Sequence, residues 1–164
     1  EDGKTLAMEP AALSSVLAAV AEDTNFEGSP RGITAVCRCE EGLALTGNTE
    51  ALGHAFENFA RNALKYSPGG GVITIAARRE GGRFTASVAD QGPGMKPGEL
   101  ERIFLPFVRG SDQATGTGFG LGLALAKRII ERHGGAVRAE NAQPQGLRIV
   151  VDLPAAAPEG PEGA

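Results

Sequence analysis

Two alternating segments, residues 72–79 and 83–89, place the strongest constraint on how this chain can fold. In each segment apolar and more polar side chains alternate, which is typical of a half-buried β-strand. Glu80, Gly81 and Gly82 separate the segments, and a glycine-containing connection of this length predicts a hairpin. Consecutive strands joined by a hairpin lie antiparallel, so a strictly alternating, doubly wound parallel sheet is excluded.

Helices are expected on either side of further short strands. Pro10 is expected in the first turn of a helix whose apolar stripe comprises Leu13, Val16, Leu17 and Val20. Strands are expected near residues 33–39, 43–45, 137–141 and 147–153, a short helical turn at 98–103, and a long helix from about 118 to 133. This order predicts a two-layer α/β (α+β) sandwich, in which helices cover one face of a mixed, mainly antiparallel sheet.

A central helix is the best-marked element of this pattern. Either Asn48 or Thr49 can cap its first turn, and the sequence does not decide between them. The helix should run to about Tyr66, because the segment Ser67-Pro68-Gly69-Gly70-Gly71 cannot continue it.

Length and composition indicate one globular domain. We expect a domain at residues 1–154 of the 164-residue chain and a flexible tail at 155–164, which offers little apolar surface to bury. The net charge of −4 argues against a nucleic-acid partner. No apolar run approaches the roughly 18 residues that span a membrane, so we expect no direct insertion of this segment. Cys37 and Cys39 are interpreted as core thiols without a redox or metal role.

The central helix carries the first group of residues that suggest chemistry. Asn58, Asn62, Lys65 and Tyr66 are spaced so that they share one helical face. An Asn carbonyl oxygen suits Mg²⁺, and a Lys ammonium suits phosphate. A face that is merely solvated explains the same pattern.

The second group, Asp90-Gln91-Gly92-Pro93-Gly94, directly follows a strand. A carboxylate at this position can accept a hydrogen bond from the exocyclic amine of adenine and would repel the carbonyl of guanine. Gly92 and Gly94 would let the backbone approach a flat base. A simple turn is the alternative.

The third group is the glycine-rich segment at residues 116–123, which runs into a helix. Alternating glycines expose backbone amides, and the start of a helix adds its positive dipole end, so together they can hold a di- or triphosphate. A flexible linker is the alternative, but linkers do not run straight into an amphipathic helix. Neither the dinucleotide-binding fingerprint nor a P-loop fits the glycine spacing.

Taken together, these segments resemble the sensor histidine kinases of bacterial two-component systems. The segment from Asn58 to Ser67 is similar to their N box, residues 90–94 to the G1 box, residues 103–109 to the F box and residues 116–123 to the G2 box. The order and spacing agree from about residue 43 to 153, and the motifs are most similar to those of kinases paired with OmpR-type response regulators. The resemblance implies a Bergerat (GHKL) ATP-binding fold and the cofactors ATP and Mg²⁺.

The resemblance also implies a role for each matched residue. Asn62 would be the main Mg²⁺ ligand, with Asn58 one turn before it, and Arg109 would approach the γ-phosphate. Asn58, Lys65 and Arg109 are therefore the implied catalytic residues. The implied nucleotide-binding residues are Asn58, Asn62, Lys65, Tyr66, Asp90, Gly92, Gly94, Gly116, Thr117, Gly118, Gly120, Leu121 and Gly122.

In this family the γ-phosphoryl group passes to a histidine on a separate dimerisation domain, and that histidine precedes an acidic residue. Here Ala55 follows His54 and Gly134 follows His133, so neither histidine fits. We therefore expect a catalytic domain that binds nucleotide but does not autophosphorylate alone.

The rest of the protein is expected from the same resemblance. The implied partners are the dimerisation domain and a response regulator, and the implied location is the cytoplasmic side of an inner-membrane sensor. The chain begins without an initiator Met or a signal peptide, so we expect it to be one part of a longer protein.

Two alternatives stay open: a nucleotide-binding relay module without transfer activity, and another GHKL-type ATPase. Such ATPases carry a catalytic Glu where Asn58 stands. The neighbouring Glu57 is rotated by about 100° around the helix and should not replace it.

Overall fold

The structure is a computed structural model that describes residues 6–106 and 122–156. Its helices are α1 (Leu13–Gly28), α2 (Thr49–Tyr66) and α3 (Gly122–Arg132). Its strands are β1 (Glu9–Ala12), β2 (Thr34–Cys39), β3 (Ala44–Gly47), β4 (Val72–Glu80), β5 (Arg83–Ala89), β6 (Ala136–Asn141) and β7 (Leu147–Pro154). Three-residue 3₁₀ turns lie at Ser29–Arg31, Pro97–Glu99 and Arg102–Phe104.

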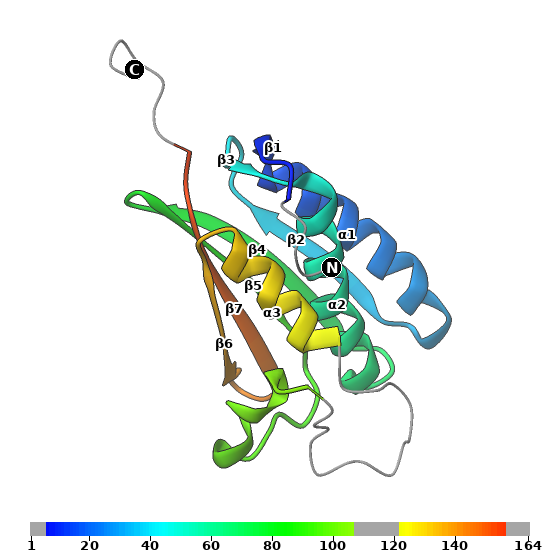
Figure 1. Cartoon of the computed structure of the whole chain (residues 1–164). Helices are drawn as coiled ribbons and strands as arrows, with labels where there is room; N and C mark the ends of the chain where they lie inside the picture. Colours follow the sequence, from blue (N-terminus) through cyan, green and yellow to red (C-terminus); the bar gives the residue numbers. More distant parts are fainter. Residues whose placement is uncertain (1–5, 107–121, 157–164) are drawn as a thin grey trace.

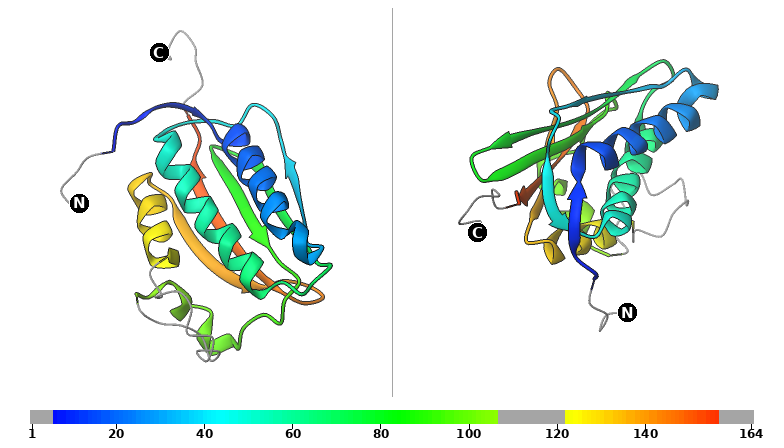
Figure 2. Two further views of the ribbon diagram at one scale, coloured as in Figure 1. Left: turned by 90° about the vertical axis from the view of Figure 1, so that its right-hand side faces the viewer. Right: turned by 90° about the horizontal axis from the view of Figure 1, so that it is seen from above.

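The described elements form two layers, as expected (Figure 1). The larger sheet has the order β2-β4-β5-β7-β6, in which β2 and β4 are parallel and all other neighbours are antiparallel. Figure 2 shows the three helices side by side across one face of this sheet. The mixed sheet with helices on one face is therefore confirmed.

The predicted hairpin joins β4 to β5 through Gly81 and Gly82. Glu80 pairs with Arg83, so two residues form the turn, and Gly81 has a φ of +64°. Positive φ at the first position of such a turn matches the twist of the flanking strands. Alternate side chains of both strands, such as Ile73, Ile75 and Phe84, are fully buried under the helices.

The N-terminal segment corrects one expectation: Pro10 lies in a strand, not in a helix. β1 pairs with β3 with Pro10 opposite Thr46, and α1 begins only at Leu13. The backbone N–H of Leu13 donates to the carbonyl of Leu43 at 2.9 Å, so pairing with the β3 side continues to the start of the helix. Proline is compatible with this short two-stranded ribbon, because strands at an edge tolerate a missing N–H.

The interpretation of the two cysteines as core thiols is wrong for Cys37 and only partly right for Cys39, which packs against the core without being fully buried. Both are free thiols on β2, where Cys37 is exposed and Cys39 is half-buried. β2 lies at one edge of the larger sheet, and none of its residues is fully buried. An alternating pattern predicts which residues share a face, but it does not predict how well that face is covered.

The ends of α2 and α3 meet around Asn48 and His133. The Asn48 side chain caps α2 by accepting from the N–H of Ala51 at 2.8 Å, which decides between the two candidate caps. The backbone N–H of Asn48 donates to His133 Nε2 at 3.0 Å, and His133 Nδ1 lies 2.8 Å from the carbonyl of Ile129. Since Nε2 accepts, the proton of the ring is on Nδ1. The buried His133 thus joins two helices.

The remaining boundaries differ little from expectation. Two 3₁₀ turns replace the single turn expected at 98–103, and Ile103 and Phe104 are buried. The expected start of the long helix at 118 lies outside the described residues. The backbone N–H groups of Ala155 and Ala156 donate to the carbonyl oxygens of Gly82 and Ala44, both at 3.0 Å, so ordered pairing extends two residues past 154.

No helix in the described part of the chain has the length and apolar character needed to cross a membrane.

Candidate functional site

Helix α2 is amphipathic, so its polar face points away from the core. One side buries Leu52, Phe56 and Phe59 completely, whereas Asn58 and Asn62 are half-buried. The two asparagines lie one turn apart and therefore on one side of the helix. Two carboxamides thus stand at an accessible part of the helical layer.

The last turn of α2 carries the other two predicted residues. The Lys65 ammonium lies 5.4 Å from the centre of the Tyr66 ring. Lys65 is exposed and Tyr66 is half-buried. A cation in the last turn also interacts favourably with the helix dipole, so Lys65 stabilises α2 independently of any ligand.

Asp90 directly follows β5 and is the most deeply buried acidic residue in the described chain, at 4% exposure. Its Oδ1 accepts from the backbone N–H of Gly92 at 2.8 Å and from that of Leu147 at 3.1 Å. Burial raises the pKa of this carboxyl above its ordinary value, and the two hydrogen bonds partly oppose the shift. Both bonds end on Oδ1, so they fix the carboxylate while Oδ2 takes part in neither.

The two predicted glycines of this loop are required by protein packing. A Cβ on Gly92 would lie 2.3 Å from the carbonyl oxygen of Tyr66, so this position lies directly against the end of α2. Gly94 has a φ of +77°, and a Cβ there would lie 2.7 Å from Asn141 Oδ1. Their contact with a nucleotide base stays a prediction, but Gly92 brings the second group of residues against the first.

Several residues that hold this loop were missed by the sequence reasoning. The Asn141 side chain accepts from the N–H of Met95 at 2.9 Å and donates to its carbonyl at 2.8 Å. Gln145 Nε2 donates to the carbonyl of Gln91 at 2.8 Å. Gly146 has a φ of +113°, and a Cβ there would lie 1.9 Å from the carbonyl oxygen of Asp90. The turn between β6 and β7 therefore fixes the Asp90 loop.

Of the third group, only Gly122 and Leu123 lie within the described residues, and both belong to α3. A Cβ on Gly122 would lie 3.3 Å from Asn58 Oδ1, which places the start of α3 beside the polar face of α2. Gly116, Thr117, Gly118, Gly120 and Leu121 lie outside the described residues, as does Arg109. The first group, on α2, therefore contacts both of the others: the second group through Gly92 and the third group through Gly122.

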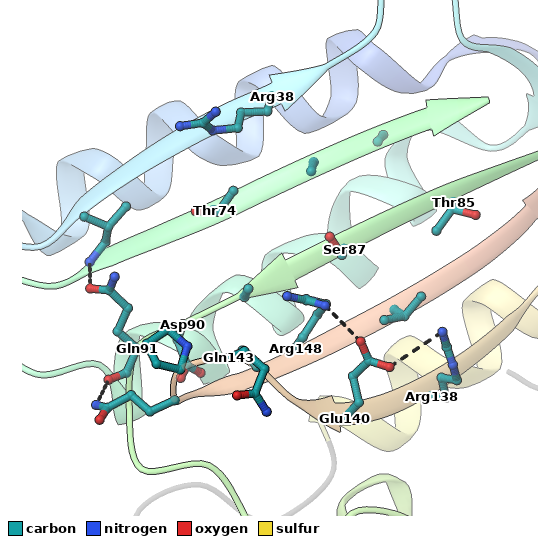
Figure 3. Close-up of a pocket in the computed structure, with 18 of the residues that line it drawn as sticks. Arg38, Thr74, Thr85, Ser87, Asp90, Gln91, Arg138, Glu140, Gln143 and Arg148 are labelled. Carbon is teal, nitrogen blue, oxygen red and sulfur yellow. Dashed lines mark hydrogen bonds and ion pairs between the residues drawn. The ribbon is translucent and has the colours of Figure 1, made fainter. Parts of the chain in front are cut away.

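A separate hollow of about 620 Å³ lies on the opposite, uncovered face of the sheet (Figure 3). Its floor is made by small side chains of β4 and β5, and Arg38, Arg138 and Arg148 stand around it. Glu140 accepts from Arg148 Nη1 at 2.9 Å. Asp90 and Gln91 line one end, but no residue of α2 contributes to the lining. The hollow is therefore not the place where the three groups of predicted residues meet.

This chain is similar in sequence to a known protein family and to individual sensor proteins. The profile of the family described as histidine kinase-, DNA gyrase B-, and HSP90-like ATPase matches residues 47–157. The sensor protein PfeS of Pseudomonas aeruginosa is 41% identical over 152 residues, which are 93% of this chain and 34% of PfeS. The chain thus spans about a third of the length of that relative.

Solved structures show the same fold. A mycobacterial sensor histidine kinase, MprB, superposes with a TM-score of 0.81 at 31% identity, covering 93% of this chain and 100% of that one. Full-length ShkA in complex with AMPPNP has a TM-score of 0.83 at 30% identity, covering 96% of this chain and 33% of that one.

Proposed function

Since the chain belongs to the family of histidine kinase-, DNA gyrase B-, and HSP90-like ATPases, we propose that it binds Mg-ATP and donates the γ-phosphoryl group to a histidine on a separate dimerisation domain. The observation that carries the proposal is the position of α2. It touches the Asp90 loop through Gly92 and the start of α3 through Asn58.

Asp90 is the proposed adenine-reading residue. Its Oδ1 is held by two backbone N–H groups, which orients Oδ2 as the acceptor for the exocyclic amine of the base. A buried carboxylate discriminates strongly, because a base without the matching donor leaves it unpaired.

Asn58 and Asn62 are the proposed ligands at the phosphate end. Their carboxamide oxygens are hard, neutral donors of the kind that Mg²⁺ accepts beside phosphate oxygens. When bound, the metal would offset the negative charge of the phosphates during transfer. Among the described residues no group of three or more His, Cys, Asp or Glu side chains could hold a metal, so the asparagines and the nucleotide are the fitting donors.

The side chains favour phosphoryl transfer over hydrolysis. The position of a hydrolytic glutamate is occupied by Asn58, and Glu57 is displaced by about 100° around α2. Lys65 and Arg109 are the proposed cations that stabilise the transferred group. Because Asn58 occupies the position of the hydrolytic glutamate, the domain should hold ATP until an acceptor imidazole arrives.

The acceptor must come from outside the described part of this chain. His133 is buried and bonded at both ring nitrogens, and His54 lies exposed on α2. Neither stands before an acidic residue. We further infer that the partners are a dimerisation domain and an OmpR-type response regulator, and that the domain works on the cytoplasmic side of a membrane sensor.

Calorimetric titration with Mg-ATP tests the binding step. Asn62→Ala should weaken binding at least tenfold, equivalent to about 1.4 kcal/mol, through loss of the metal ligand. Gln143→Ala, on the opposite face, is the matched control and should bind as the wild type does. Equal loss in both variants, or no binding by the wild type, contradicts the proposed site.

Incubation with γ-labelled ATP tests the transfer step. A separately purified dimerisation domain should gain acid-labile, base-stable label only when this domain is present, and this domain alone should gain none. Steady ATP hydrolysis without the acceptor would favour the ATPase alternative. Binding without either reaction would favour the relay module.

A further inference from the structure

Cys37 and Cys39 form a close thiol pair on the edge strand β2, away from the proposed nucleotide site. Their Sγ atoms are 3.1 Å apart, and each thiol is free. Their partners in β4 are Ile75 and Ala77, so both thiols lie on the helix-covered side of the sheet. The pair stands where β2 has only one neighbouring strand in the larger sheet (Figure 1).

The two thiols differ in their access to solvent. Cys37 is exposed, whereas Cys39 is half-buried and packs against the core. Burial, followed by the hydrogen bond with Cys37 and repulsion from its thiolate, raises the pKa of Cys39 to about 12. Because the thiolate is the nucleophile, Cys37 is the thiol that meets a reagent first. Blocking Cys37 would remove the two effects through which it raises the pKa of Cys39.

We propose that Cys37 and Cys39 are an oxidisable dithiol site that exchanges with low-molecular-weight disulfides to close an intrastrand disulfide. The Cys37 thiolate attacks one sulfur of the small disulfide, forms a mixed disulfide and releases one small thiolate. The Cys39 thiolate then attacks Cys37 Sγ and releases the second. The protein loses two electrons and two protons, and the small disulfide gains them as two thiols.

The strand geometry makes this bond easy to reverse. Alternate residues of a parallel strand are about 6.6 Å apart, near the upper limit of about 6.8 Å for the Cα atoms of a disulfide. Closing the bond therefore draws Cys37 and Cys39 together and puckers β2 around Arg38. A strained, exposed disulfide is readily reduced, which is the behaviour of a regulatory bond and not of a structural one.

The consequence should be local to the α1 side of the molecule. β2 pairs with β4 and packs under α1, whereas the end of α2 meets the Asp90 loop and its polar face meets α3. Oxidation should lower the Tm, because it strains β2. The inference does not depend on the proposed nucleotide function.

Treatment of the folded protein with glutathione disulfide, followed by intact-mass measurement, tests the proposal. The wild type should become a monomer lighter by two hydrogen atoms, with no glutathione attached and no thiol left to alkylate, and dithiothreitol should restore it. A lasting glutathione adduct, an intermolecular dimer, or two thiols that stay alkylatable would each overturn the proposal.

Matched variants separate the two thiols. Cys39→Ser should stop at one attached glutathione on Cys37, and Cys39→Ala repeats the measurement without a polar atom near the core. Cys37→Ser should react more slowly than Cys39→Ser, because only the half-buried thiol remains. An equal or faster reaction of Cys37→Ser would overturn the assignment of Cys37 as the entering thiol.

Discussion

Asp90 is a residue whose position costs stability. Its burial raises the pKa of the carboxyl above the ordinary value of 3.8. In the pH range between that value and the folded-state pKa, the folded chain holds a proton that the unfolded chain has lost. Raising the pH through this range therefore destabilises the fold, and the full cost is present once the pH exceeds the folded-state pKa.

We therefore predict that Asp90→Asn is at least as stable as the wild type at pH 7. The amide oxygen can still accept from Gly92 and Leu147, while the buried charge is removed. Urea unfolding at several pH values checks this, and the advantage of the variant should shrink as the pH falls towards 4. A variant that is clearly less stable at pH 7 would show that the carboxylate is stabilising.

The same substitution should lower the affinity for Mg-ATP at least tenfold, or by about 1.4 kcal/mol. An Asn places a donor where the adenine amine needs an acceptor. Asp152→Asn is a matched control. The Asp152 carboxylate pairs with Arg83 Nε at a distance of 2.7 Å, and this pair is not part of the Asp90 loop. Titration calorimetry on both variants checks the prediction, and unchanged affinity in Asp90→Asn would remove Asp90 from the site.

Among the elements, α2 contains a glycine with no visible structural task. Apart from the adjoining residues and the backbone of α2 itself, no atom lies within 4 Å of a Cβ built on Gly53, and the residue is inside the helix. Gly53→Ala should stabilise the fold by about 0.5–1 kcal/mol through helix propensity. Thermal unfolding measures this, with Gly92→Ala as the contrast, since its Cβ would meet Tyr66 and must destabilise. The account of α2 fails if both substitutions act in the same direction.

The junction of α2 and α3 depends on His133. His133→Ala removes both ring hydrogen bonds and leaves a cavity, so we expect a loss of about 2–4 kcal/mol in the free energy of unfolding. His54→Ala, at an exposed position on α2, should change it by less than about 0.5 kcal/mol. Chemical denaturation compares them, and a small effect of His133→Ala would contradict its role as the link.

Elements with strong periodicity were predictable to within a residue or two, as β4, β5 and the end of α2 at Tyr66 show. Pro10 was misplaced because pairing of β1 with β3 overrides a local helix signal. Likewise, Asn48 and Thr49 are both residue types that cap helices, so the sequence could not decide between them. The observed cap, Asn48, also forms hydrogen bonds with His133 and Ala7, which are distant in the sequence.

The candidate site residues were predicted from local motifs, but the residues that support them were not. Asn141 and Gly146 lie about 50 residues beyond the Asp90 loop and contact its backbone, Asn141 through its side chain and Gly146 through its own backbone, and such contacts leave no local pattern. The only signal was the glycine of Gly146 in a turn. Similarly, alternation placed Cys37 and Cys39 on one face but could not show that the face is open at the sheet edge.

At the scale of the whole molecule, the sheet separates two possible binding faces. The helical face carries Asn58, Asn62 and Gly122, and the open face carries the arginine-lined hollow. Asp90 lies at the end of β5, where the two faces meet. The volume of a hollow alone does not decide which face binds nucleotide, so the assignment depends on the chemistry of the side chains.

An amide NMR titration with Mg-AMPPNP tests the central claim most directly. The account predicts the largest shift changes at Asn58, Asn62, Gly122 and residues 90–94, with little change at Arg38 and Ser87. Changes centred on Arg38 and Ser87, or no saturable change anywhere, would contradict a nucleotide site formed between α2, α3 and the Asp90 loop.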